Sequence, residues 1–322
     1  MKATTTLFRR IVGLIVIVPV AAFLFDLSPA LATPILGSEL ASFAVLGGST
    51  VTNTGATTLT GNLGVSPGSA ITGAGTITVN GTNAATPGNP SVHENDAFAI
   101  LAQSQLVTAK TDLGLLGPGT LEPVDLVGLT LPPGVYTVPA GVSNLTGVLT
   151  LDGLGNANAA WVFQVSSTLI TSPGAVVDVI NAGANAGVYW NVASSATLDT
   201  TTSFEGNILA LASVTLNHAA TIGCGRALAH TGAVTMDNNT ISIGCTNTVE
   251  AGTNGFSGGL DVTKISGGTE VTFLPFAAIS PVPEPGTFLL YGFGLAALLG
   301  HLVTGRNGAR RVTSPATGRH RR

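Results

Sequence analysis

The chain has little charge for its length. Only 9% of its 322 residues are Asp, Glu, Lys or Arg, whereas an ordinary soluble domain has about 25%. Between residues 33 and 305 there are 15 acidic residues but only three basic ones, namely Lys110, Arg226 and Lys264. Such a balance repels phosphate backbones, and it therefore argues against a nucleic-acid partner.

The residue patterns of enzymes and metal sites are also missing. No serine stands in a nucleophile elbow, and the histidines lack the spacing of a metal site or catalytic triad. Lyases and hydrolases built on coiled strands need paired carboxylates, or a carboxylate with a basic partner, in a groove. We interpret Arg226, the only arginine of the central region, as a structural contact. The five histidines are His93, His218, His230, His301 and His320. We therefore expect no enzyme activity, cofactor or metal.

Cysteine occurs only twice, in matching contexts. Cys224 follows Ile222-Gly223 and Cys245 follows Ile243-Gly244, which places the pair 21 residues apart. Stacked strands lie about 4.8 Å apart, a separation that a disulfide tolerates. We predict a bridge between neighbouring coils in an oxidising compartment, and two free thiols are the alternative.

The N-terminus has the layout of a secretory signal peptide. Lys2, Arg9 and Arg10 precede an apolar run over residues 11–25, and Ala30-Leu31-Ala32 is a small-residue cleavage pattern. We predict export, with a signal peptide of residues 1–32 that signal peptidase cleaves after Ala32. An N-terminal membrane anchor is the alternative, although the run is short for spanning.

The C-terminus, residues 282–322, has three parts in order. Pro283-Glu284-Pro285 precedes an apolar stretch at 288–303, and a cluster of arginines follows. This tail resembles the PEP-CTERM sorting signal of Gram-negative bacteria that make exopolysaccharide. The resemblance implies processing by an exosortase and transient membrane association on the way to the cell surface or outside. A permanent single-pass transmembrane helix is the alternative.

A short phrase recurs through the middle of the chain, with a threonine between apolar residues and Asp or Asn after them. Successive threonines stand 18 and 20 residues apart from Thr197 onward, which is the length of one repeated supersecondary unit. Side chains alternate along a strand, so inward apolar flanks leave the threonine outward. Stacked coils then form an outward column, which we predict to contain Thr150, Thr197, Thr215 and Thr235, with Ser195 and Ser213 beside them.

The Asp and Asn of this phrase, Asp152, Asp199, Asn217 and Asp237, stand where each coil must turn. Their side chains form local hydrogen bonds that favour turns. A calcium site would need clustered carboxylates, which the sequence does not provide, so the turn interpretation is preferred.

One segment departs from the strand pattern. Apolar residues recur at helical spacing over residues 91–116, after a possible capping box of Ser91 and Glu94. We predict one amphipathic helix lying on the coil, with Asp96, Lys110 and Asp112 facing water. Beyond residue 248 the sequence becomes rich in Gly and Ser, which predicts a spacer over 249–281 with a loose hairpin around Val262 and Val271.

Five phrases in the order of the chain resemble the microbial ice-binding protein family. They are residues 62–68 (NLGVSPG), 129–136 (LTLPPGVY), 161–165 (WVFQV), 204–210 (FEGNILA) and 225–229 (GRALA). The resemblance implies an all-β fold, a right-handed discontinuous parallel β-helix with one long α-helix alongside, over residues 33–248. It further implies that a flat face of the β-helix adsorbs to ice in some members.

Two functions therefore remain open from the sequence. The first is an exported ice-binding, antifreeze-like protein that uses the threonine column to inhibit ice growth or recrystallisation. Threonine suits such a surface, because its hydroxyl can join a water lattice and its branched Cβ restricts rotamers. The second is a non-catalytic matrix or adhesion protein that contacts extracellular polysaccharide through the same scaffold.

Overall fold

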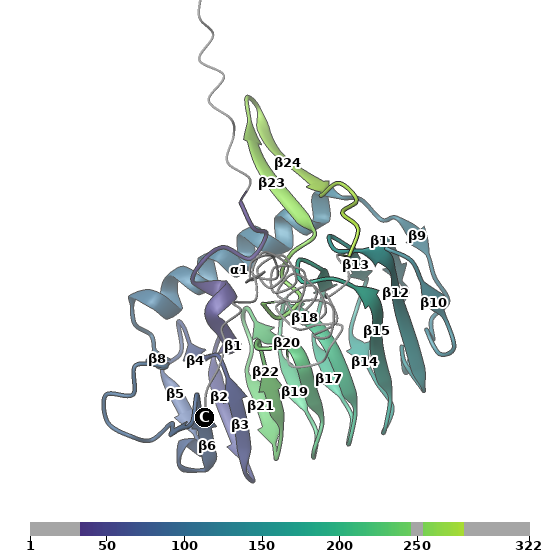
Figure 1. The fold of residues 1–322 in the computed structure, drawn as a ribbon. Coiled ribbons are helices and arrows are strands. Elements are labelled where there is room, and N and C mark those ends of the chain that lie inside the picture. The colour runs from purple at the N-terminus through teal and green to yellow at the C-terminus, as the bar shows by residue number, and fades with distance from the viewer. Residues whose placement is uncertain (1–32, 246–253, 280–322) are drawn as a thin grey trace, which may run out of the picture.

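The computed structural model describes residues 33–245 and 254–279, and it shows a stack of short parallel strands with one long α-helix along its side (Figure 1). The coils of the stack have three faces. Face 1 is a six-stranded parallel sheet of β14 (Leu169–Ile170), β17 (Ala196–Leu198), β19 (Val214–Leu216), β21 (Val234–Asp237), β2 (Thr50–Thr54) and β5 (Ala70–Thr72).

Faces 2 and 3 together form a 16-stranded sheet, because the long strands β18 (Ser203–Ala210) and β20 (Thr221–Ala229) run from one face into the other. Face 2 also contains β10 (Thr130–Leu131), β12 (Val148–Asn156), β15 (Val176–Ala182), β22 (Thr240–Ser242), β3 (Thr57–Thr60) and β6 (Ile77–Val79), with β7 (Thr82–Asn83) antiparallel at its end. Face 3 also contains β9 (Thr120–Leu121), β11 (Gly134–Val138), β13 (Ala160–Val165), β16 (Gly187–Val192), β1 (Phe43–Gly47), β4 (Asn62–Val65) and β8 (Val92–Glu94).

The first coils of the chain stack on its last coil. On face 3, β1 lies between β20 and β4. The same junction crosses the other faces, where β2 pairs with β21 and β3 pairs with β22, all in parallel. We call this junction the seam. Strands distant in sequence therefore lie side by side in one continuous stack.

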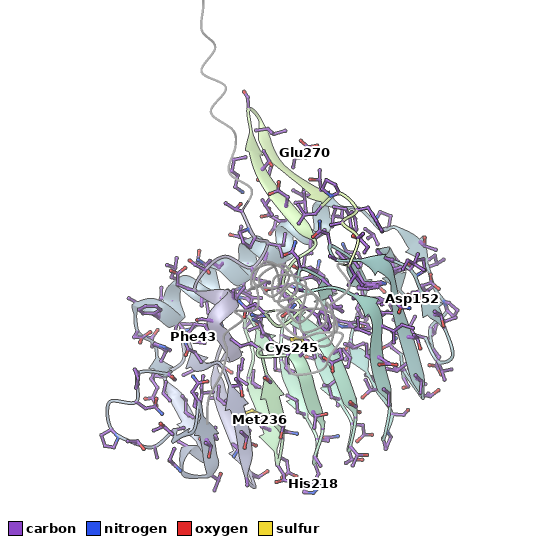
Figure 2. The ribbon with its side chains drawn as sticks, in the orientation of Figure 1. Phe43, Asp152, His218, Met236, Cys245 and Glu270 are labelled. Carbon is purple, nitrogen blue, oxygen red and sulfur yellow. A yellow bond between two sulfur atoms is a disulfide. The ribbon has the colours of Figure 1, made fainter. Side chains whose placement is uncertain are left out.

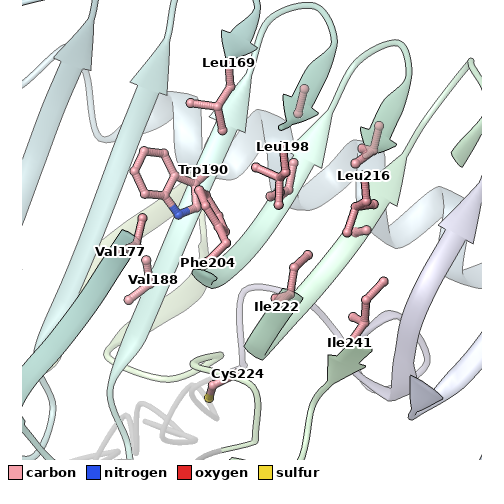
Figure 3. Packing of buried hydrophobic residues seen from close by; sticks show 14 of the residues in the cluster. Leu169, Val177, Val188, Trp190, Leu198, Phe204, Leu216, Ile222, Cys224 and Ile241 are labelled. Carbon is pink, nitrogen blue, oxygen red and sulfur yellow. The ribbon is translucent and has the colours of Figure 1, made fainter. Parts of the chain in front are cut away.

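Alternating apolar side chains fill the interior of the coils. Leu198 and Leu216 of face 1 point toward Phe204 and Ile222 of face 2, and all four are buried (Figure 3). Deeper along the stack, Phe163 and Trp190 stack with ring centroids 3.9 Å apart. Side chains on the remaining strand positions therefore point outward.

Helix α1 (Ala97–Leu115) covers face 3. Its N-cap is Asp96, whose Oδ1 accepts a hydrogen bond from the backbone N–H of Ala99 at 2.9 Å. The predicted start at Ser91 was wrong, because Val92–Glu94 pairs with β4 as strand β8. The pairing of residues 92–94 with β4 therefore determined their structure, and the apparent capping box of Ser91 and Glu94 did not.

Of the three charged residues that were predicted to face water, Asp96 does so, and Lys110 and Asp112 do not. Asp96 is exposed, but Asp112 is buried, and the Nζ of Lys110 donates to Asn191 Oδ1 and to the carbonyl oxygens of Val192 and Leu209 at 2.8–2.9 Å. Burial lowers the pKa of Lys110 to about 8. The exposed side of the helix instead carries apolar residues, Phe98, Ile100, Leu101, Val107 and Leu115.

The predicted spacer is in part ordered structure. The hairpin expected around Val262 and Val271 exists, since these residues pair in the antiparallel strands β23 (Leu260–Ile265) and β24 (Gly268–Phe273). Phe256 is fully buried in the core. Residues 254–279 therefore contribute a side chain to the core, and the hairpin projects from the stack (Figure 1).

Arg226 holds the ends of the domain together. It is fully buried, and its guanidinium donates to the carbonyl oxygens of Ala41, Asn254 and Gly255 and to Asn207 Oδ1. Burial lowers the pKa of this guanidinium to about 10. The structural role expected for Arg226 is thus confirmed, with contacts to both the N-terminal segment and residues 254–255.

The predicted disulfide between Cys224 and Cys245 is present, with Cα atoms 4.9 Å apart. In the two described ranges, no helix has the length and hydropathy needed to span a bilayer. The predicted signal peptide at 1–32 and the predicted sorting signal, with Pro283-Glu284-Pro285 and the apolar stretch at 288–303, lie outside the described residues.

Candidate functional site

Face 1 carries a straight outward column of five threonines. The strand pairings place Thr197 beside Thr215, Thr215 beside Thr235, Thr235 beside Thr52, and Thr52 beside Thr72. Ile170 precedes Thr197 at the end of the column. All five threonines are half-buried or exposed, while the residues before and after each one along the strand point inward or toward a turn.

The hydroxyls of this column have no partner within the described part of the protein. Inward threonines behave differently: Thr57 Oγ1 donates to Asn53 Oδ1 at 2.6 Å, and the hydroxyls of Thr171 and Thr202 lie 2.8 Å apart. The column thus presents free donors and acceptors to whatever lies outside face 1.

A second outward column stands two residues earlier on each strand. Its members are small and uncharged, namely Thr168, Ser195, Ser213, Ala233, Thr50 and Ala70. Ser195 Oγ accepts a hydrogen bond from the backbone N–H of Ser213 at 3.3 Å, so this hydroxyl is partly engaged. No Asp, Glu, Lys or Arg occurs in either column, and the surface is therefore low in relief and free of charge.

The column is held rigidly from beneath. Val214, Leu216, Val234 and Met236 flank Thr215 and Thr235 and are essentially inaccessible to solvent. Their packing fixes the strands, and the branched Cβ of threonine restricts each χ1 angle. The array is consequently preorganised before anything binds to it.

Asp199, Asn217 and Asp237 line the corner between faces 1 and 2, whereas Asp152 lies in β12 on face 2, beside Ile180 (Figure 2). Asn217 Nδ2 donates to Asp199 Oδ1 at 2.9 Å, and Asp199 Oδ1 also accepts from the backbone N–H of Thr200 at 2.7 Å. The hydrogen bonds from Asn217 and Thr200 lower the pKa of Asp199. These contacts support the turn interpretation, and they keep the carboxylate at the edge of the array.

Thr150 does not belong to the column, contrary to the prediction. It lies on face 2, where β12 pairs it with Thr130 on one side and with Asp178 on the other. The repeated phrase predicts an outward threonine before a turn. Because a coil has three faces, and a strand on any of them can have such a threonine, the phrase does not indicate on which face the threonine lies. The structure brings Thr197, Thr215, Thr235, Ser195 and Ser213 together, and it leaves Thr150 elsewhere.

Thr52 and Thr72 are members of the column that sequence reasoning missed. Val51-Thr52-Asn53 does follow the repeated phrase in part, but its neighbour on the sheet is β21, far away in the sequence. Only the seam between the first and last coils reveals that these strands are adjacent.

The described residues offer little for catalysis or metal binding. They contain no group of three or more His, Cys, Asp or Glu that could hold a metal ion. A cavity of about 580 Å³ lies between the N-terminal segment and residues 254–261, but Asp261 is the only acidic residue in its lining. Glycoside hydrolysis would need two carboxyl groups there.

Comparisons with known proteins identify what the chain resembles. A family model described as "Ice-binding-like" matches residues 45–242. A protein of Nostoc sp. (strain HG1) named "Ice-binding protein" is 45% identical over 205 residues, covering 63% of this chain and 72% of that protein.

Solved structures agree with this match. An ice binding protein from an Antarctic Biological Consortium is 42% identical, with a TM-score of 0.57, covering 65% of this chain and 91% of the other. An ice-binding protein from the Antarctic ascomycete Antarctomyces psychrotrophicus is 34% identical, with a TM-score of 0.58, covering 66% of this chain and 98% of the other.

Proposed function

The chain belongs to the ice-binding-like family, and from this premise we propose that it is an ice-binding protein that adsorbs to ice through face 1. The column Thr197, Thr215, Thr235, Thr52 and Thr72, with its free hydroxyls, is the observation on which this proposal rests. Ser195 and Ser213 belong to the same surface, and Thr150 does not.

Ice offers neither a pocket nor a charged group, so its recognition depends on many weak contacts made at once. Strands about 4.8 Å apart repeat the hydroxyls at a constant interval, and a rigid surface loses little entropy on binding. Each threonine hydroxyl can join the layer of ordered water, while its methyl group shields that water from disorder. Adsorbed molecules then hinder the advance of the crystal between them.

The proposed activity needs no chemistry at a reactive centre, and we infer that the protein is not an enzyme. A matrix or adhesion role is the less favoured alternative, because the relatives described above bear the name of ice-binding proteins. Neither a cofactor nor a metal enters the proposed mechanism.

We also infer the finer details of fold and location. Parallel crossovers are right-handed in nearly all proteins, which supports a right-handed coil, and the seam supports a discontinuous β-helix. The leader at 1–32 and the disulfide support export to the cell surface or beyond. Exosortase processing near Pro283-Glu284-Pro285, a transient membrane association of 288–303 and contact with exopolysaccharide stay proposals from the sequence.

The direct test is the effect of the purified protein on ice. We expect thermal hysteresis and inhibition of ice recrystallisation, both rising with protein concentration. A protein that changes neither property at high concentration would contradict the proposed function and favour the matrix alternative.

A further inference from the structure

Face 2 carries a separate array of outward hydroxyls around the seam. Strands β22 and β3 each present two outward polar residues spaced by one inward apolar residue, and β6 presents one, Thr78. The pairings place Thr240 beside Thr58 and Thr58 beside Thr78, and they place Ser242 beside Thr60. The result is two columns, of which the second contains Ser242 and Thr60.

The first column of this array is longer than the second. Thr221 lies beside Thr240, and Ser203 lies beside Thr221, so the column contains five hydroxyl residues in register, Ser203, Thr221, Thr240, Thr58 and Thr78. It ends where Val176 pairs with Ser203, and Asp178 lies beyond that point. The hydroxyl array thus occupies only the seam half of face 2.

Most hydroxyls of this array are available to a ligand. Thr58, Thr60 and Thr240 are exposed, and no described residue accepts or donates a hydrogen bond at their side chains. Two hydroxyls are engaged: Ser242 Oγ donates to the carbonyl oxygen of Gly244 at 2.8 Å, and Thr221 Oγ1 donates to that of Thr202 at 3.4 Å. No charged residue occurs among the array positions, and the inward neighbours Ile241, Leu59 and Val79 are buried.

Faces 1 and 2 are parts of the same coils and meet at one rigid corner. Within one coil, β21 of face 1 is joined to β22 of face 2 through Asn238 and Asn239, and Asn239 Nδ2 donates to the carbonyl oxygens of Asn217 and Ala220. Because the corner turns the chain from one sheet to the other, the two arrays are not coplanar. One flat crystal plane can therefore contact only one of them at a time.

We propose that the seam half of face 2 is a second ice-binding surface, which adsorbs to crystal planes different from those bound by face 1. The ligand is the same ordered water, recognised by threonine hydroxyls on rungs about 4.8 Å apart and on alternate strand residues about 6.6 Å apart. This proposal rests on the proposed function. It adds that the protein has two non-equivalent orientations on ice, each with its own array.

The test is the pattern of ice planes to which the fluorescently labelled full-length protein binds on a single-crystal hemisphere. Five proteins are compared: the wild type, Thr58→Tyr for face 2, Thr215→Tyr for face 1, the double variant Thr58→Tyr/Thr215→Tyr, and Thr108→Tyr as a control on α1, away from both arrays. Circular dichroism and thermal unfolding establish that each variant keeps the fold. Tyrosine at these outward positions disrupts flatness without entering the core.

We expect the wild type and Thr108→Tyr to label the same planes. Thr58→Tyr should lose some of these planes and keep the others, while Thr215→Tyr should lose the complementary set. The double variant should label none. If Thr58→Tyr binds like the wild type and Thr215→Tyr binds nowhere, face 2 is not a binding surface, although the proposed function stands. If the wild type itself binds no plane, both proposals are wrong.

Discussion

Thr52 pairs directly with Thr235 on face 1, although the two residues come from opposite ends of the coiled domain. The seam between them is closed by backbone pairing on all three faces. The threonine column therefore gains Thr52 and Thr72 from the first coils, and without the seam it would contain only Thr197, Thr215 and Thr235.

Substitution of Thr215 by tyrosine tests the centre of the column. Thr215 has a threonine on either side, so a bulky ring there separates the surface from a flat ice plane. We expect loss of most thermal hysteresis, measured by nanolitre osmometry, with an unchanged far-UV circular dichroism spectrum. Thr108→Tyr on the exposed side of α1 is the matched control and should keep full activity.

If the activity of Thr215→Tyr equals that of the wild type, the principal ice-binding surface lies off face 1. A variant that loses activity together with its circular dichroism signal would instead report unfolding, and Thr235→Tyr would then replace it.

A second prediction concerns the seam and the position of Thr150. Thr52→Tyr should reduce thermal hysteresis about as much as Thr235→Tyr, because the two residues are neighbours in one array. Thr150→Tyr should leave the activity unchanged, since this residue lies outside both hydroxyl arrays, on the part of face 2 away from the seam, beside Thr130 and Asp178. Equal losses for Thr150→Tyr and Thr235→Tyr would mean that the repeated phrase, rather than the sheet, defines the site.

The disulfide should contribute to stability but not to adsorption. Cys224 and Cys245 are separated by 21 residues, and closure of a loop of this length stabilises a protein by about 3 kcal/mol. We expect the double variant Cys224→Ser/Cys245→Ser to unfold at lower urea concentration and to keep ice activity near 0 °C. Identical urea midpoints for the two proteins would show that the bridge does not constrain the unfolded chain.

Lys110 should make stability depend on alkaline pH. Burial lowers its folded-state pKa from 10.5 to about 8, so between these values the unfolded chain binds a proton that the folded protein has lost. Stability therefore rises with pH in this window, on the order of 2 kcal/mol between pH 7 and 9.5.

The measurement is urea unfolding of the wild type and of Lys110→Met across that range. Lys110→Met lacks the titrating ammonium group, so its stability should not show the increase that Lys110 causes. The difference in unfolding free energy between the two proteins therefore measures the contribution of Lys110. A difference that stays constant from pH 7 to 9.5 would mean that the pKa of Lys110 is not depressed.

Repeat spacing predicted the members of the column that lie on consecutive coils. Intervals of 18 and 20 residues from Thr197 to Thr235 correspond to single turns of the coil, and the structure places these residues in register. The interval from Thr150 to Thr197 does not match the length of one coil, so it does not place the two residues on the same face. A coil has three faces on which a strand with alternating side chains can lie. The sequence pattern therefore identified an outward side chain without identifying its face.

The features that the sequence did not predict depend on contacts between distant segments. Ser91 begins no helix because β8 finds a partner in β4, and Lys110 turns inward because Asn191 and two strand carbonyls offer acceptors beneath the helix. Local composition contains neither of these facts. The disulfide was predictable because both cysteines occupy the same place in neighbouring coils.

Helix α1 limits how this fold can grow. Its 19 residues span about 28 Å along face 3, carrying the chain from the first coils to the far end of the stack. A gene duplication that inserted one more coil would lengthen the stack by about 4.8 Å, and the helix would need about three extra residues to match it. Unlike an open solenoid, this protein can enlarge its binding surface only if two separate parts of the gene change together.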